Sequence, residues 1–89
     1  MDTIRGKVTN VVDGDTFDMS VTHHGKDNEY EYNNPERIRV SGIDTPEINT
    51  TQGKRDKTKL ESIILNKEVR VYIDARDTYG RVVGNVKLV

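Results

Sequence analysis

The chain has 89 residues, a third of them charged, a formal net charge of −1 and no cysteine. This length fits one domain close to the smallest size that supports its own core, and the absence of cysteine excludes a disulfide framework and thiolate metal sites. A near-neutral charge argues against nucleic-acid binding by bulk electrostatics, and no apolar run approaches the roughly 18 residues of a membrane span. Valine and isoleucine dominate the apolar residues, which favours strands over helices.

The first two apolar-patterned segments, 3–12 and 16–21, are predicted to be strands. Asp13-Gly14 lies between them, and this dipeptide between two strands is a strong hairpin signal. Gly6 indicates a bulge or a close backbone approach within the first strand. The hairpin leaves Asp15 at a strand end, where its carboxylate is available to a site.

The polar segment 23–34 predicts a long connection, in which Tyr30 and Tyr32 are candidates to extend a strand. His23 and His24 are adjacent, so in a strand their rings would point to opposite faces and could not chelate one ion. No third metal ligand accompanies them. We therefore expect exposed loop histidines and no histidine metal site.

The segment 37–47 joins a strand to a charged loop. Apolar and polar residues alternate along its first half, which places its arginines, including Arg39, on the face opposite the apolar one. Pro46 ends the strand because proline lacks a backbone N–H. Asp44 and Glu47 are therefore expected at the strand end, close to Arg39. A solvated turn would also collect such charges, but a guanidinium and two carboxylates suit a functional site.

A helix and two strands complete the chain. Apolar residues recur at helical spacing over 60–64, and Asn66 suits a left-handed C-terminal cap. Further strands are expected over 68–74 and 81–88, separated by a turn. Five short strands with one helix between the third and the fourth predict a mainly β (α+β) fold, a five-stranded Greek-key OB-fold barrel, as a single domain over 1–89.

Three charged blocks occur in a fixed order along this chain: Val12-Asp-Gly-Asp-Thr16, then Arg39 with Gly42-Ile-Asp-Thr-Pro-Glu47, then Tyr79-Gly-Arg81. Together they resemble the signature blocks of the staphylococcal nuclease (thermonuclease) family, and the resemblance runs over about residues 5–88. It implies an endonuclease that hydrolyses DNA and RNA with little sequence specificity, preferring single strands and leaving 3′-phosphate ends. It also implies a monomer without membrane association, secreted or at the cell surface, although this chain carries no signal peptide.

The resemblance implies a calcium site. Asp15 and Asp44 resemble the family's two carboxylate ligands, and Thr45 resembles the residue that gives its backbone carbonyl. Oxygen ligands from few side chains, supplemented by water, suit calcium and would also admit manganese or magnesium. A cation there would neutralise charge on a phosphodiester and orient a water molecule.

The resemblance also implies catalytic and substrate-binding residues. Arg39 and Arg81 resemble the two arginines that hold the scissile phosphate, a role for which the planar guanidinium fork is suited and the lysine ammonium is not. Tyr79 resembles a tyrosine near the terminal phosphate of the nucleotide. Glu47 resembles the carboxylate that activates or orients the attacking water. A glutamate with an ordinary pKa of about 4.3 is a weak base at neutral pH, which favours the orienting role.

Three features depart from the family pattern. Asp56 and Lys59 occupy helix positions that the family usually fills with apolar residues, so we expect the helix to dock loosely. Thr78 stands where some members have a phosphate-contacting lysine, which should weaken nucleotide binding. The chain ends at Val89, before the family's C-terminal helices, so we expect a truncated or minimal domain of low stability.

Two other functional classes fit parts of this sequence. One is a nucleic-acid-binding or protein-binding barrel that has lost catalysis, and the other is a structural barrel that binds no phosphate. A structural barrel leaves Arg39, Asp44 and Arg81 unexplained, and binding alone does not require Glu47. Retention of all five charged catalytic positions, Asp15, Arg39, Asp44, Glu47 and Arg81, therefore favours the nuclease.

Overall fold

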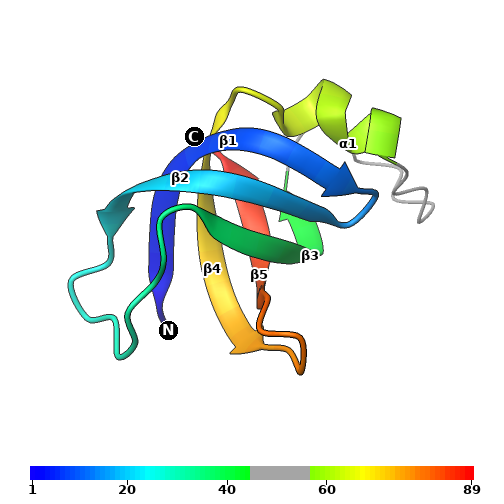
Figure 1. The fold of residues 1–89 in the computed structure, drawn as a ribbon. Coiled ribbons are helices and arrows are strands. Elements are labelled where there is room, and N and C mark those ends of the chain that lie inside the picture. Colours follow the sequence, from blue (N-terminus) through cyan, green and yellow to red (C-terminus); the bar gives the residue numbers. More distant parts are fainter. Residues whose placement is uncertain (45–56) are drawn as a thin grey trace.

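The computed structural model describes residues 1–44 and 57–89, and it shows a closed β-barrel with one helix (Figure 1). The elements are β1 (Thr3–Asp13), β2 (Thr16–His24), β3 (Glu36–Asp44), α1 (Lys57–Ile64), β4 (Glu68–Arg76) and β5 (Val82–Leu88). The strands close in the order β1-β2-β3-β5-β4, with β3 and β5 parallel and the other neighbours antiparallel. This arrangement confirms the predicted OB-fold class and the place of the helix.

β1 takes part in two pairings, with β2 on one side and β4 on the other. A bulge lies between Arg5 and Gly6 on the β2 side. A Cβ atom at position 6 would lie 1.8 Å from the backbone oxygen of Ser20, so only glycine fits there. The bulge predicted at this glycine is therefore confirmed, and its physical reason is the close approach of β2.

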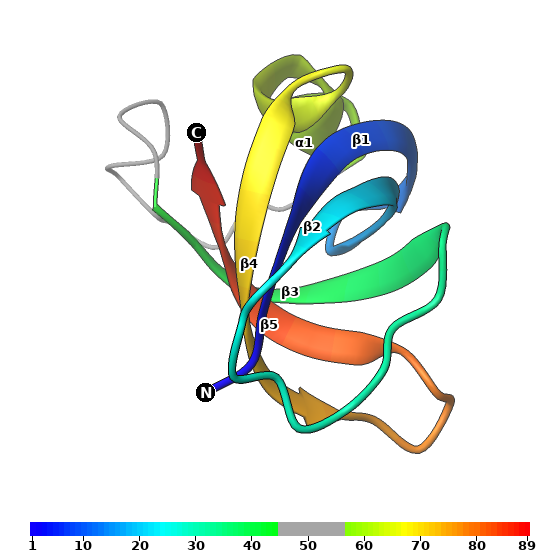
Figure 2. The ribbon, with the colours of Figure 1, turned by 90° about the vertical axis from the view of Figure 1, so that its left-hand side faces the viewer.

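The inward-facing residues of all five strands form one core, which α1 closes at one end of the barrel (Figure 2). The largest fully buried side chains include Phe17, Ile4, Met19, Ile38 and Ile64. Alternation along the strands produces this core, because every second side chain points into the barrel.

α1 docks through its predicted apolar stripe, with Leu60, Ile63 and Ile64 all buried. Asn66 has φ 65°, as expected for a left-handed cap, and its N–H donates to the carbonyl of Val8 at 3.0 Å. These contacts fix the end of α1 against β1. The loose docking predicted from Lys59 is not evident at these three positions, and Asp56 lies outside the described residues.

The connection between β2 and β3 differs from the prediction in two ways. β2 continues to His24, so His23 and His24 belong to a strand, although they are exposed as expected. Tyr30 and Tyr32 do not extend a strand, because residues 25–35 form an irregular connection that contains three asparagines, Gly25 and Pro35, residue types that interrupt strands. Among the described residues, no helix is long and apolar enough to cross a membrane.

Asp2 holds this connection against the end of the barrel. The residue is 9% exposed, and its carboxylate accepts hydrogen bonds from the backbone N–H of Glu29 at 2.9 Å, that of Tyr30 at 3.2 Å and the hydroxyl of Tyr32 at 2.7 Å. Its backbone carbonyl accepts from the N–H of Ile73 in β4 at 2.9 Å. The Tyr32 hydroxyl and the Glu29 N–H lower the pKa of Asp2 below its ordinary value, because they favour the charged form.

We expect the stability of the barrel to fall in acid, with part of the fall due to Asp2. A carboxyl whose folded pKa lies below its ordinary value of 3.8 stabilises the fold above about pH 4 and loses that contribution as pH falls through the folded pKa. Asp2→Asn should therefore lower the melting temperature at pH 7 and flatten the acid part of its pH profile. Thermal unfolding between pH 7 and pH 2 measures both effects. Asp27→Asn, at an exposed carboxylate of the same connection, is the control, and identical profiles for the two variants would contradict the role of Asp2.

Candidate active site

The β1–β2 turn, the middle of β3 and the β4–β5 turn meet at one side of the barrel. The N–H of Val40 donates to the backbone carbonyl of Asp15 at 2.7 Å, and Thr16 pairs with Arg39 in the β2–β3 register. On the other side of β3, Arg39 pairs with Val83, two residues beyond Arg81. The barrel thus brings together Asp15, Arg39 and Arg81, which lie far apart in the sequence.

Asp15 presents a partly exposed carboxylate next to Arg39. Its N–H donates to the carboxylate of Asp13 at 3.0 Å, which stabilises the turn and lowers the pKa of Asp13. One carboxylate oxygen of Asp15 accepts the hydroxyl of Thr16 at 2.9 Å, and the other lies 3.6 Å from the Nε of Arg39. The side chains of Asp15 and Arg39 are 37% and 47% exposed, so both are accessible to a ligand.

Arg81 is fixed in orientation by Asp77. The Nε of Arg81 donates to Asp77 at 2.7 Å, and the backbone N–H groups of Arg81 and Tyr79 both donate to the other carboxylate oxygen at 2.9 Å. Burial raises the pKa of Asp77, but these hydrogen bonds outweigh it and the pKa lies below its ordinary value. With its Nε held in this way, Arg81 directs its Nη1 toward Thr16 and the rest of the site.

Thr16 connects the two halves of the site. Its hydroxyl lies 3.4 Å from Nη1 of Arg81 and donates to the carboxylate of Asp15, while the residue itself is 2% exposed. A continuous chain of contacts therefore runs from Arg81 through Thr16 and Asp15 to Arg39. Sequence analysis did not assign roles to Thr16 or Asp77. The signal for Asp77 was present, since an aspartate four residues before an arginine at a turn can accept from both its backbone and its side chain.

Tyr79 lies at the tip of the β4–β5 turn and is 84% exposed. Its ring centroid is 5.5 Å from the guanidinium carbon of Arg81, within range of a cation–π contact. Gly80 permits this turn, with φ 85° and an N–H that donates to the carbonyl of Asp77 at 3.0 Å. The turn thus places an exposed aromatic ring beside a candidate phosphate-binding arginine.

The two exposed arginines of β3 differ in their partners. Arg37 makes two hydrogen bonds to Asp18, at 2.8 and 3.1 Å, which lower the pKa of that carboxyl. Arg39 has only its longer contact with Asp15 among the ion pairs of residues 1–44 and 57–89. Arg39 therefore has more donors available for an anionic ligand than Arg37.

The remaining predicted residues belong to the end of β3 and the loop after it. Asp44 is the last residue of β3 and pairs with Lys87 of β5. The side chain of Asp44, together with Thr45 and Glu47, lies outside the described residues, so their predicted roles stay predictions.

Within the part of the chain that the structure describes, no three acidic, histidine or cysteine side chains cluster as a metal site. The accessible Asp15 carboxylate has the hard oxygen chemistry that calcium prefers, so the available donor fits the expected ion.

Comparison with known proteins places the chain in a family. The family model of the staphylococcal nuclease homologue matches residues 37–89. The chain is 33% identical to a micrococcal nuclease of Shigella flexneri, over 92% of this chain and 41% of the relative. It is 32% identical to an uncharacterized endonuclease of Escherichia coli, over 93% of this chain and 48% of the relative. It is 42% identical to a probable staphylococcal-like nuclease of Oryza sativa subsp. japonica, over 56% of this chain and 14% of the relative.

The chain spans less than half the length of each of these relatives. No solved structure matches it significantly. The family match covers β3, the helix and the last two strands, so it includes Arg39 and Arg81. On these matches, the chain belongs to the staphylococcal nuclease homologue family.

Proposed function

We propose that this chain forms the catalytic barrel of a calcium-dependent nuclease that hydrolyses phosphodiester bonds of DNA and RNA with low sequence specificity and a preference for single strands. The observation that carries the proposal is the contact chain from Arg81 through Thr16 and Asp15 to Arg39. It combines two guanidinium groups and an accessible carboxylate on one side of the barrel. The names of the relatives support nuclease chemistry for the family.

The two arginines suit the electrostatic demands of phosphodiester hydrolysis. As water attacks in line, negative charge builds on the non-bridging oxygens of the phosphate, and guanidinium groups can donate two parallel hydrogen bonds to them. Arg81 is oriented in advance by Asp77, so its terminal nitrogens need little rearrangement on binding. Arg39 lies on the other side of Asp15, so a phosphate bound between the two arginines would contact both.

Asp15, with Asp44 and the carbonyl of Thr45, would hold the calcium ion in this proposal. When bound, the ion supplies positive charge to the phosphate and a site for an ordered water molecule. Glu47 would position that water by accepting a hydrogen bond from it. The exposed ring of Tyr79 offers a stacking or hydrogen-bonding surface to the flanking nucleotide.

Calcium removal tests the proposal directly. We expect cleavage of end-labelled denatured DNA in the presence of calcium, loss of cleavage on addition of a calcium chelator, and recovery when excess calcium is restored. Duplex DNA of the same sequence should be cleaved more slowly. The variant Asp15→Asn should weaken calcium binding, measured by calorimetry, because a neutral amide replaces a charged oxygen ligand.

Two results would contradict the proposal. Undiminished cleavage with the chelator would remove calcium from the mechanism. Binding of single-stranded DNA without cleavage, at any calcium concentration, would identify the chain as a nucleic-acid-binding barrel and not as an enzyme. The two arginines could still bind phosphate in that case.

A further inference from the structure

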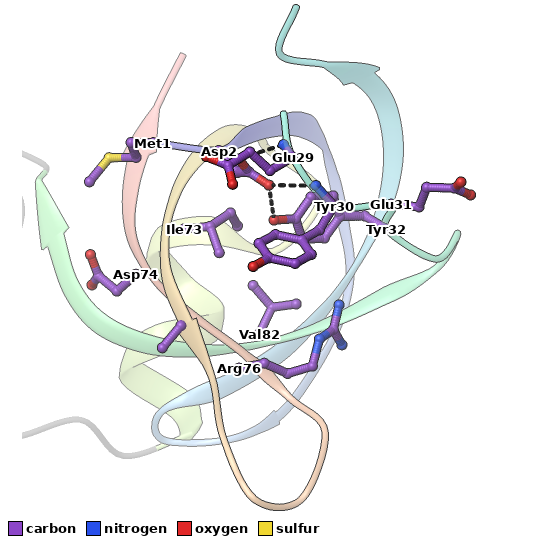
Figure 3. Close-up of a pocket in the computed structure, with 11 residues that line it drawn as sticks. Met1, Asp2, Glu29, Tyr30, Glu31, Tyr32, Ile73, Asp74, Arg76 and Val82 are labelled. Carbon is purple, nitrogen blue, oxygen red and sulfur yellow. Dashed lines mark hydrogen bonds between the residues drawn. The ribbon is translucent and has the colours of Figure 1, made fainter. Parts of the chain in front are cut away.

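A second concave site lies at the end of the barrel opposite α1. It is a pocket of about 610 Å³ between the N-terminus, the 25–35 connection and the ends of β4 and β5 (Figure 3). This volume is within the range of pockets that hold small ligands or single side chains. Asp15, Arg39 and Arg81 do not line it, so it is distinct from the candidate active site.

The walls of the pocket combine apolar and aromatic surfaces on a fixed frame. Ile73 and Val82 contribute from the barrel, and Tyr30 and Tyr32 contribute from the 25–35 connection, with the Tyr32 hydroxyl on the Asp2 carboxylate (Figure 3). Asp2 accepts hydrogen bonds from the backbone of Tyr30 and from the hydroxyl of Tyr32. The ring of Tyr32 and the backbone of Tyr30 are therefore attached to the barrel by a buried carboxylate, so this wall of the pocket is preformed.

The charge around the pocket is negative. Its lining includes four carboxylates, of Asp2, Glu29, Glu31 and Asp74, against two cationic groups, the side chain of Arg76 and the N-terminal amino group of Met1. Glu29 and Glu31 make no ion pair with the residues that the structure describes, and Glu31 points outward from the rim in Figure 3. This charge repels phosphate groups and attracts cations. The pocket is thus opposite in charge to the candidate active site, which contains Arg39 and Arg81.

Arg76 shows which kind of cation this wall accepts. Its guanidinium carbon lies 5.9 Å from the ring centroid of Tyr32, and its Nη2 lies 3.9 Å from the carboxylate of Glu36, a residue only 3% exposed. An aromatic face and a carboxylate therefore already hold one guanidinium beside the pocket. Tyr30 is 70% exposed as a residue, and its ring has no such cation among the described residues.

We propose that this pocket binds an arginine side chain of a partner protein segment. The guanidinium would stack on Tyr30 near the acidic rim, with the aliphatic stem over the partly buried Ile73. A peptide is favoured over a free small cation because the pocket also presents exposed apolar surface, at Met1, which is 81% exposed. Exposed methionine and tyrosine side chains are typical of protein interfaces. This inference is independent of the nuclease activity.

The test is titration of the protein with a blocked tripeptide, acetyl-Gly-Arg-Gly-amide, followed by NMR of the backbone amides. We expect saturable shifts at residues 29–32 and 73–76, and an isosteric citrulline peptide should bind several-fold more weakly because it lacks the charge. Tyr30→Ala should weaken binding of the arginine peptide about three- to fivefold, the range of an exposed cation–π contact. Tyr79→Ala, which removes a similarly exposed tyrosine elsewhere, should leave binding unchanged.

Three outcomes would overturn the proposal. Equal affinity for the arginine and citrulline peptides would exclude recognition of the charge. Equal loss of affinity in Tyr30→Ala and Tyr79→Ala would show unspecific contact with exposed rings. Spermine binding as tightly as the peptide, with the same shifts and the same dependence on Tyr30, would assign the pocket to small polyamine cations and not to a protein segment.

Discussion

Arg81→Lys and Arg39→Lys are each expected to lower the turnover number for single-stranded DNA by about 10²–10³-fold, the size of effect seen when one donor to a transition-state oxyanion is lost. Each variant keeps one positive charge, so the loss comes from geometry. A lysine at position 81 could not donate to Asp77 and present two coplanar donors to a phosphate at the same time, as the guanidinium can. Single-turnover cleavage at saturating calcium measures the effect.

Folding should change much less than turnover in these two variants. The Arg39–Asp15 pair is exposed, and exposed ion pairs contribute at most about 1 kcal/mol to stability, while a lysine at position 81 keeps a positive charge beside Asp77. Arg37→Lys is the matched control, because Arg37 lies on the same strand and faces Asp18. Its turnover should remain close to that of the unsubstituted protein. Equal losses of turnover at positions 37 and 39 would show that β3 contributes only general positive charge.

Local patterning was sufficient to predict the barrel. Alternation along the strands, the Asp13-Gly14 turn and the left-handed Asn66 are signals of a few residues each, and the structure confirms them. The path of residues 25–35 was not predictable in the same way, because it depends on Asp2, which lies more than twenty residues away in the sequence. Tyrosine has a high strand propensity, but the hydroxyl of Tyr32 donates to that buried carboxylate. This tertiary contact outweighs the propensity.

The sequence identified the charged residues of the candidate site but not the residues that connect them. The three charged blocks identified Asp15, Arg39 and Arg81, and the barrel brings these three together. The connecting roles of Thr16 and Asp77 emerged only with the structure, since each acts through hydrogen bonds whose geometry a sequence does not specify. The pocket beside Tyr30 also had no sequence signal, because its walls come from both ends of the chain.

Phe17→Ala is expected to have the largest effect on stability. Phe17 is completely buried at the centre of the barrel, where it pairs with Val11 of β1 on one side and Ile38 of β3 on the other. Truncating a buried phenylalanine to alanine costs about 3–5 kcal/mol, and the whole free energy of unfolding of a small domain is about 5–15 kcal/mol. We therefore expect a fall in melting temperature of at least about 12 °C, with much of the protein unfolded at physiological temperature.

The same substitution links the core to the proposed activity. Phe17 follows Thr16 directly, so loss of its packing loosens the strand that supports the contact chain between Asp15 and Arg81. Calcium together with a nucleotide should restore part of the lost stability, because ligands that bind only the folded state shift the equilibrium toward it. Thermal unfolding with and without these ligands measures the recovery. Tyr79→Ala is the control for stability, since this exposed side chain should contribute no more than about 0.5 kcal/mol. A melting temperature for Phe17→Ala close to that of the control would show that the barrel centre is not the main source of stability.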